Sequence, residues 1–145
     1  MFTVTDSQII RRAPAAVFEA AADPQAQLKW DADALESVEK LTSGPLARGS
    51  RIRARFKALG TVEYEFVVYD PPRTFTWHSA LPRWENWHAF DFEAVPDGTR
   101  LTQHSTFKLK GLWKLATPLI RQLVTRRLPA MATAIADYLN AGVTA

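Results

Sequence analysis

The spacing of apolar residues changes near position 110, and this change constrains the fold more than any other feature. From Leu35 to Leu109, apolar and polar residues alternate, and turn-forming residues separate the alternating runs. Alternation is typical of half-buried strands. The runs predict strands near 35–42, 50–58, 61–69, 74–80, 84–95 and 99–109. After Gly111 the apolar spacing becomes about 3.6 residues, which predicts one long helix that ends near Asn140.

The first thirty residues predict a strand followed by two short helices. The strand covers about 3–12, and the helices run from Ala15 to Ala22 and from Pro24 to about Trp30. Pro14 suits a first helical turn, where its missing N–H costs nothing. Strands and helices do not alternate along the rest of the chain, so the predicted class is α+β.

The long helix contains two prolines, Pro118 and Pro129. Each proline removes a helical hydrogen bond, so we expect a late start or a kink near both.

Length and composition indicate one globular domain over residues 1–145. Hydrophobic residues make up 47% of the chain and charged residues 23%, which is enough to build a core. No apolar run approaches the ~18 residues that a membrane span needs, and the N-terminus lacks a signal-peptide pattern. Without cysteines the chain has no disulfide and no thiolate site. We therefore expect a cytoplasmic protein with no integral membrane segment.

The net charge of +3 and the isoelectric point of about 9.4 raise the question of nucleic-acid binding. The basic residues argue against it. A three-residue turn at 58–60 predicts that Arg55 faces Glu63 and that Arg53 faces Glu65 across neighbouring strands. Paired basic residues do not form the open basic face of a nucleic-acid binder, so we expect no nucleic-acid partner.

Strand alternation assigns a set of side chains to the inner face of the sheet. The same turn that pairs the charges pairs Phe56 with Val62, and a two-residue turn at Asp97-Gly98 pairs Phe92 with Gln103. The inner aromatic residues are Phe56, Tyr64, Phe66, Phe75, Trp77, Trp84, Phe90, Phe92 and Phe107. Interleaved with them are the polar residues Ser79, Asn86, His88, Gln103 and Ser105.

Two interpretations of this face stay open. Aromatic residues are often plain core, and the polar side chains could bond to one another or to buried water. Alternatively, several polar groups among aromatic walls predict a cavity for a small molecule, because a buried polar group without a partner costs ~1–3 kcal/mol.

The sequence resembles a known family, the START-like (SRPBCC) helix-grip superfamily, close to its polyketide cyclase/dehydrase and lipid-transport group. The resemblance is carried by residues 9–30 (IIRRAPAAVFEAAADPQAQLKW), 69–77 (YDPPRTFTW) and 97–107 (DGTRLTQHSTF), and by the helix after KGLWKLATPLI. It implies a Bet v 1-like fold, a seven-stranded curved antiparallel sheet around a long C-terminal helix. It also implies a cavity for a lipid, polyketide or other hydrophobic molecule, with Trp30 near its entrance. Trp113, early in the long helix, either lines this entrance as well or packs as a helix residue on the sheet.

These observations together define a candidate ligand site. Its predicted residues are Trp30, Phe56, Tyr64, Phe66, Phe75, Trp77, Trp84, Asn86, His88, Phe90, Gln103, Ser105 and Trp113. We favour binding or carriage of a small hydrophobic ligand, and we expect no metal and no cofactor.

Two alternatives remain. In the first, a cyclase or dehydratase-type enzyme uses His88 as acid and base, with Tyr64 or a pocket water as its partner, while Asn86 and Gln103 polarise a substrate carbonyl. In the second, the chain is a protein-interaction module, with a homodimer contact at Trp87 on the outer face of the sheet.

Overall fold

The computed structural model describes residues 1–143, which form one curved sheet and four helical segments. In chain order the elements are β1 (Phe2–Ile10), α1 (Pro14–Ala22), α2 (Pro24–Trp30), β2 (Leu35–Lys40), β3 (Arg51–Phe56), β4 (Gly60–Asp70), β5 (Thr74–Ala80), β6 (Trp84–Val95), β7 (Gly98–Leu109), η1 (Gly111–Ala116) and α3 (Thr117–Val143). The predicted α+β class and element order are confirmed. None of the helices in this described part combines the length and hydropathy needed to cross a bilayer.

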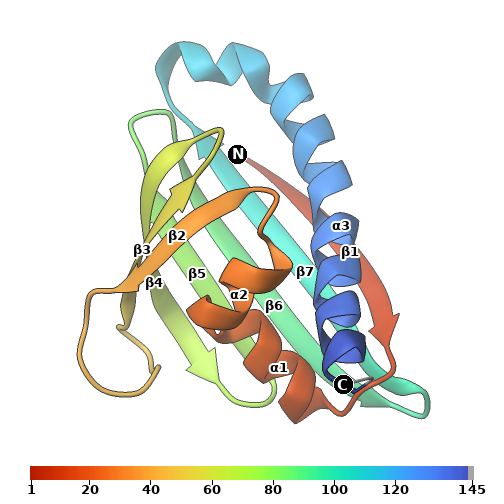
Figure 1. Ribbon diagram of the computed structural model, residues 1–145. Coiled ribbons are helices and arrows are strands. Elements are labelled where there is room, and N and C mark those ends of the chain that lie inside the picture. Colours follow the sequence, from red (N-terminus) through yellow and green to blue (C-terminus); the bar gives the residue numbers. More distant parts are fainter. Residues whose placement is uncertain (144–145) are drawn as a thin grey trace.

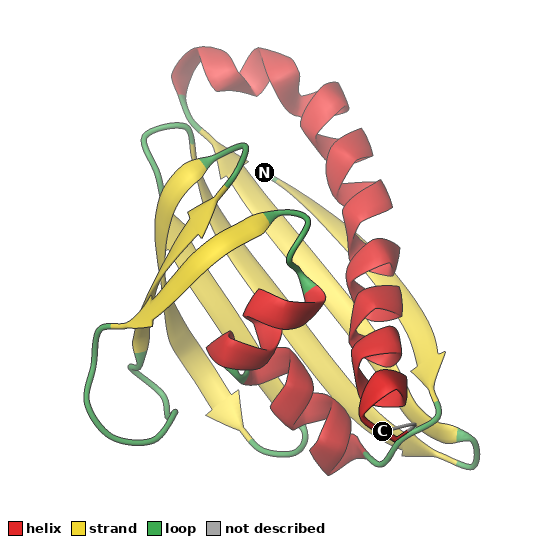
Figure 2. Ribbon diagram, viewed as in Figure 1, coloured by secondary structure: helices red, strands yellow, loops and turns green. Residues whose placement is uncertain are grey.

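All seven strands belong to one antiparallel sheet in the order β1-β7-β6-β5-β4-β3-β2. The sheet curves around α3, which crosses its concave face, and α1 and α2 lie beside the C-terminal half of that helix (Figures 1 and 2). The predicted helix-grip architecture is therefore confirmed.

Local chemistry accounts for the two short helices. Pro14 and Pro24 occupy the first turns of α1 and α2, where no backbone N–H is required. Asp23 separates the helices, and its side chain accepts a hydrogen bond of 3.0 Å from the N–H of Gln25. Such an N-cap satisfies one of the free N–H groups at a helix start.

The expected effect of the two prolines is confirmed at the start of the long helix. The chain first forms the 3₁₀ segment η1 and becomes α-helical only at Thr117, one residue before Pro118. Pro129 lies inside α3.

The predicted faces of the strands are correct, but three predicted registers are wrong by two residues. In the β3–β4 hairpin, Phe56 pairs with Gly60 and Arg53 pairs with Glu63, because the turn closes earlier than expected. Gly60 has a φ of +79° and ends this turn as the first residue of β4. A shift of two preserves the side-chain faces, so the inner set is unchanged.

The registers of the two later hairpins also differ by two residues from those expected. A four-residue turn at 80–83 predicts that Phe75 pairs with His88, but Phe75 pairs with Phe90. Gln103 also pairs with Phe90 rather than with Phe92. In the last hairpin Gly98 belongs to the strand, because its φ of +135° lets the chain turn at the two residues before it.

A bulge in β4 explains the remaining error. The register shifts between Phe66 and Val68, so Val68 pairs with Thr76 and Tyr69 pairs with Phe75. Strand alternation from Tyr64 and Phe66 predicts that Val68 faces inward, but Val68 is exposed and Tyr69 turns inward instead. A bulge inserts one extra residue and therefore reverses the faces beyond it.

One end of the inner face is solid aromatic core. Phe66, Phe75, Phe90 and Phe92 pack together there, and Phe18 of α1 closes the group. The cavity described below occupies the other end.

Candidate ligand-binding site

A cavity of about 490 Å³ lies between the sheet and the N-terminal half of α3. The sheet wall comes from β3 to β7, and α3 supplies the opposite wall. Its lining residues are Gln27, Asp33, Ala34, Phe56, Lys57, Ala58, Leu59, Val62, Tyr64, Trp77, Ser79, Leu81, Trp84, Asn86, His88, Ser105, Phe107, Leu123, Val124, Arg127, Leu128 and Met131. Most of these are apolar, and the volume falls within the range typical of small-molecule sites.

A hydrogen-bonded chain behind the wall fixes the orientation of His88. The amide nitrogen of Gln103 donates to the carbonyl oxygen of Leu128 at 2.8 Å, and the Gln103 Oε1 lies 2.9 Å from His88 Nε2. A backbone carbonyl only accepts, so the amide oxygen of Gln103 must face the histidine. Nε2 therefore carries the proton, and Nδ1 is an acceptor without a partner among the described residues.

The environment of His88 keeps its ring neutral. Burial lowers the pKa of His88 from 6.5 to about 4, and the positive charge of Arg127 acts in the same direction. The hydrogen bond that the ring donates to Gln103 acts in the opposite direction. The ring stacks on Phe90 with centroids 4.5 Å apart and meets the edge of Trp77 at 5.6 Å. At neutral pH this site presents an uncharged, rigidly held imidazole.

Asn86 presents a second acceptor. Its Nδ2 donates to Ser105 Oγ at 3.1 Å and to the carbonyl oxygen of Thr106 at 2.9 Å, so both amide protons are used. Its Oδ1 has no partner among residues 1–143. Asn86 is therefore not free to donate to a substrate carbonyl, and Gln103 lies outside the cavity lining, so the expected polarising pair is not formed.

Two further polar side chains of the wall come from β4 and β5. Tyr64 donates its hydroxyl to Gln27 Oε1 of α2 at 3.2 Å, and burial raises the pKa of Tyr64, so the phenol stays protonated. The indole N–H of Trp77 is buried and has no acceptor in the described part of the chain.

Charged residues lie at the rim. Arg127 of α3 holds Asp31, at the end of α2, with two contacts of 3.2 and 2.7 Å. Asp33 and Lys57 are exposed on the same rim. The ion pair ties α3 to α2 beside the cavity.

The structure brings seven of the thirteen predicted site residues onto the cavity wall: Phe56, Tyr64, Trp77, Trp84, Asn86, His88 and Ser105. Four others are packed elsewhere. Phe66, Phe75 and Phe90 belong to the solid core, and Gln103 is buried behind His88.

The two tryptophans expected at the entrance also lie off the wall. Trp30 is buried in the core and donates its indole N–H to the carbonyl oxygen of Ala20 at 2.9 Å. Trp113 of η1 is 44% exposed and meets the edge of Trp84, with centroids 5.8 Å apart.

Several wall residues were absent from the predicted site. Leu123, Leu128 and Met131 belong to the α3 wall, and all three fall on the apolar spacing of about 3.6 residues that predicts this helix. Gln27 and Arg127 carried no such signal, because their positions depend on how α2 and α3 pack.

On the outer face, Trp87 lies half-buried beside His78, with ring centroids 5.0 Å apart. The homodimer contact at Trp87 stays a prediction.

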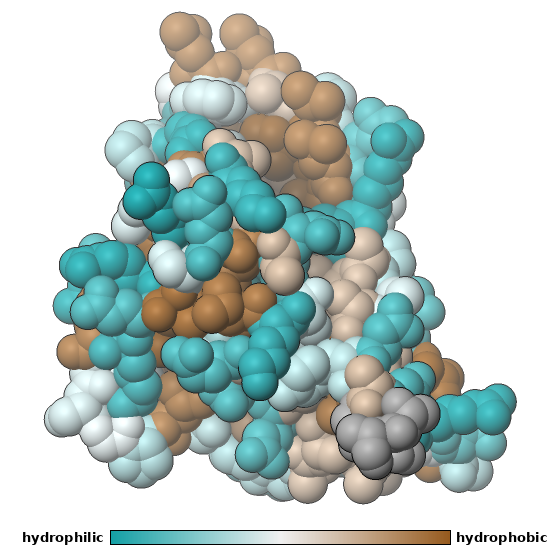
Figure 3. Space-filling model, in the orientation of Figure 1, coloured by the Kyte–Doolittle hydropathy of each residue, from teal (hydrophilic) through white to brown (hydrophobic). Residues whose placement is uncertain are grey.

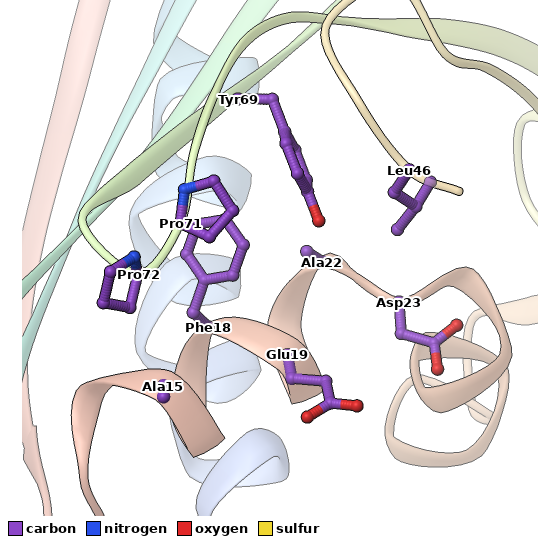
Figure 4. Close-up of a pocket in the computed structure, with 9 residues that line it drawn as sticks. All are labelled: Ala15, Phe18, Glu19, Ala22, Asp23, Leu46, Tyr69, Pro71 and Pro72. Atoms are coloured by element: carbon purple, nitrogen blue, oxygen red, sulfur yellow. The ribbon is translucent and has the colours of Figure 1, made fainter. Parts of the chain in front are cut away.

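A second, more open cleft of about 510 Å³ lies beside α1 (Figure 4). The phenol of Tyr69 and the side chain of Leu46 point into it, and the carboxylates of Glu19 and Asp23 lie along its lower edge. None of the predicted site residues lines this cleft.

Comparison with solved structures finds the same fold at low sequence identity. The Zhui aromatase/cyclase from Streptomyces sp. R1128 is 17% identical, with a TM-score of 0.79 over 94% of this chain and 92% of that one. A protein from Thermus thermophilus is 21% identical, with a TM-score of 0.78 over 97% and 99%. A truncated norcoclaurine synthase from Thalictrum flavum is 14% identical, with a TM-score of 0.74 over 95% and 92%.

At the level of sequence, a comparison with curated proteins found no match. The family described as polyketide cyclase / dehydrase and lipid transport, in contrast, matches residues 1–140. Nearly the whole chain is covered, and the fold agrees with it. The chain therefore belongs to the polyketide cyclase/dehydrase and lipid-transport family of START-like proteins.

Proposed function

We propose that this protein binds one small, mostly apolar molecule that carries a hydroxyl group at its buried end. The observation that carries the proposal is the cavity of about 490 Å³, whose largely aromatic and aliphatic wall exposes an acceptor at His88 Nδ1. Lipids, polyketides and aromatic compounds fit this description. The family description and the aromatase/cyclase relative are consistent with ligands of this kind.

The hydroxyl follows from the hydrogen-bonding groups left over in the wall. His88 Nδ1 and Asn86 Oδ1 both lack a donor among the described residues. Both amide protons of Asn86 are already used. A phenol, enol or alcohol supplies the missing donor, whereas an ether or ester of the same size does not.

Ligand binding can be tested first without knowing the ligand. Native mass spectrometry of the purified protein should show a retained apolar compound. A cavity-filling variant, Val62→Trp, should lose it, because Val62 lies on the cavity wall. Thr61→Trp is the matched control, since Thr61 is exposed on the opposite face of the same strand.

The preference for a hydroxyl can be tested with 2-naphthol and 2-methoxynaphthalene. We expect naphthol to bind about five-fold more tightly, which corresponds to about 1 kcal/mol for one hydrogen bond. His88→Phe should remove the preference while both probes still bind. Equal affinity for the two probes in the wild type would contradict the proposed hydroxyl, and failure of both to compete with an apolar dye would contradict the cavity proposal.

Acid–base catalysis is the second candidate, and the unpartnered, oriented Nδ1 of His88 favours it. The pKa of about 4 counts against it, because an efficient general base has a pKa near the working pH. Proton exchange of 2-tetralone into D₂O, followed by NMR, separates the two functions. Binding alone predicts no acceleration over buffer, and catalysis predicts an acceleration that His88→Phe abolishes.

A further inference from the structure

The N-terminal end of the long helix exposes an unusual set of large apolar side chains. We call Leu112, Trp113, Leu115, Leu119 and Leu123 the apolar tip. Leu112 and Leu115 are 85% and 82% exposed, and Leu119 and Leu123 are 59% and 57% exposed. Figure 3 shows hydrophobic side chains gathered at this end, where η1 and the first turns of α3 lie in Figure 1. Large contiguous patches of this kind mark interaction sites.

The charged residues around the apolar tip are all basic. Residues 98–136 contain seven basic residues and no acidic one; the basic residues are Arg100, Lys108, Lys110, Lys114, Arg121, Arg126 and Arg127. Lys110, Lys114 and Arg121 flank the tip directly, and none of them makes an ion pair within the described residues.

Some basic residues on the strands, in contrast, lie beside carboxylates. Arg53 contacts Glu39 and Glu63, and Arg100 contacts Glu93. Beside the exposed leucines, however, the basic residues have no acidic residue near them in the sequence and no ion pair in the described part of the chain, so the apolar side chains and the positive charge must be explained together.

We propose that the apolar tip docks the protein on the surface of an anionic lipid membrane. Leucine and tryptophan side chains bordered by lysine and arginine are the pattern of a segment that lies in a membrane interface, with its apolar residues below the headgroups. The basic residues add attraction to anionic lipid. A second copy of this chain fits less well, because a symmetric contact through the tip would bring two sets of unpaired positive charges together.

The shape of the surface also favours lipid over an acidic protein. The leucines project from a protruding helical end, and insertion into a lipid layer needs no matching pocket. The tip is also continuous with the cavity, since Leu123 belongs to both and Trp113 packs on Trp84 of the cavity wall. A docked molecule would therefore hold its cavity rim close to the membrane, but docking itself does not depend on ligand binding.

Vesicle co-sedimentation tests this proposal. The full chain should sediment with vesicles of equal parts phosphatidylcholine and phosphatidylglycerol, should bind phosphatidylcholine vesicles at least ten-fold more weakly, and should be released by high salt. Leu112→Asp with Leu115→Asp should reduce binding at least ten-fold, as should Lys110→Glu with Lys114→Glu.

Matched variants control for general effects of charge. Ile9→Asp changes an exposed apolar residue on β1, and Arg11→Glu with Arg48→Glu changes two exposed basic residues elsewhere. These variants should bind vesicles like the wild type. Retention of 2-naphthol binding by the tip variants would show that their fold and cavity are intact.

Three results would overturn the proposal. One is equal binding to neutral and anionic vesicles, and another is equal loss in tip and control variants. In the third, the protein does not bind vesicles but self-associates in analytical ultracentrifugation, and the leucine variants abolish this self-association. Vesicle binding without any naphthol binding would leave docking supported and would contradict the proposed cavity function alone.

Discussion

Acidification should destabilise the fold through His88, and the effect can be calculated from its burial. In the folded protein the pKa of His88 is about 4, because burial disfavours the charged ring, whereas an unfolded chain should show the ordinary 6.5. Between pH 6.5 and about pH 4, His88 is protonated in the unfolded chain but stays neutral in the folded protein. The free energy of unfolding should therefore be fully retained above pH 6.5 and fall as the pH drops from 6.5 to about 4.

The size of the loss follows from the gap between the two pKa values. At about 1.4 kcal/mol per pH unit, the gap from 6.5 to about 4 amounts to about 3 kcal/mol. This is a large share of the ~5–15 kcal/mol that stabilises an ordinary domain.

Urea unfolding followed by tryptophan fluorescence, repeated from above pH 7 down to about pH 4, measures this dependence. His88→Phe should remove the histidine contribution, so the difference between wild type and variant isolates it from the titration of carboxylates. His104→Gln is the control, since His104 lies on the outer face beside Asp91. NMR titration of the three histidine rings provides a second measurement, in which His88 should remain neutral at pH 5. If His88→Phe keeps the full wild-type slope, or if the His88 ring protonates near pH 6.5, the reasoning is wrong.

Two further substitutions test contacts that hold the sheet. Gln103→Leu should lower the free energy of unfolding by about 2–4 kcal/mol, because the buried Nε2–H of His88 loses its acceptor. In a His88→Phe background the same substitution should cost clearly less. If urea unfolding shows that the two losses simply add, the two side chains are not coupled and the reasoning is wrong. Gly98→Ala should cost about 2–3 kcal/mol, since a Cβ would lie 2.3 Å from the carbonyl oxygen of Ile10 at a φ of +135°. Gly44→Ala, at a φ of +83° with open space around it, should cost about 1 kcal/mol in the same assay, and equal losses at the two glycines would refute the steric argument.

The side-chain faces were predictable because an error of two residues leaves them unchanged. The sequence placed Tyr64, Trp77 and His88 on one face, although two of the three registers used were wrong. What the sequence did not reveal was at which residues each turn lies, which depends on where a glycine such as Gly60 takes its positive φ. The bulge that exposes Val68 was also invisible, since a bulge leaves no mark in apolar spacing.

The division between core and cavity could not be predicted from strand patterns. Phe75 and Trp77 are alternate residues on the same face of β5, yet Phe75 is packed solid and Trp77 lines the cavity. The difference comes from the helices above them, because Phe18 of α1 covers Phe75. Strand alternation carries no information about where α1 ends or where α3 leaves the sheet.

This division has a consequence for how the site can change. The core end is built from Phe66, Phe75, Phe90 and Phe18, whose loss would cost several kcal/mol each. At the cavity end, residues such as Val62 already face unfilled space, so a larger side chain can extend into the cavity without displacing packed neighbours. His88 stands at the boundary, because its ring stacks on the core residue Phe90 while its Nδ1 remains available to a ligand. Ligand preference should therefore vary through the other wall residues at little cost to stability, whereas changes at His88 should alter binding and stability together.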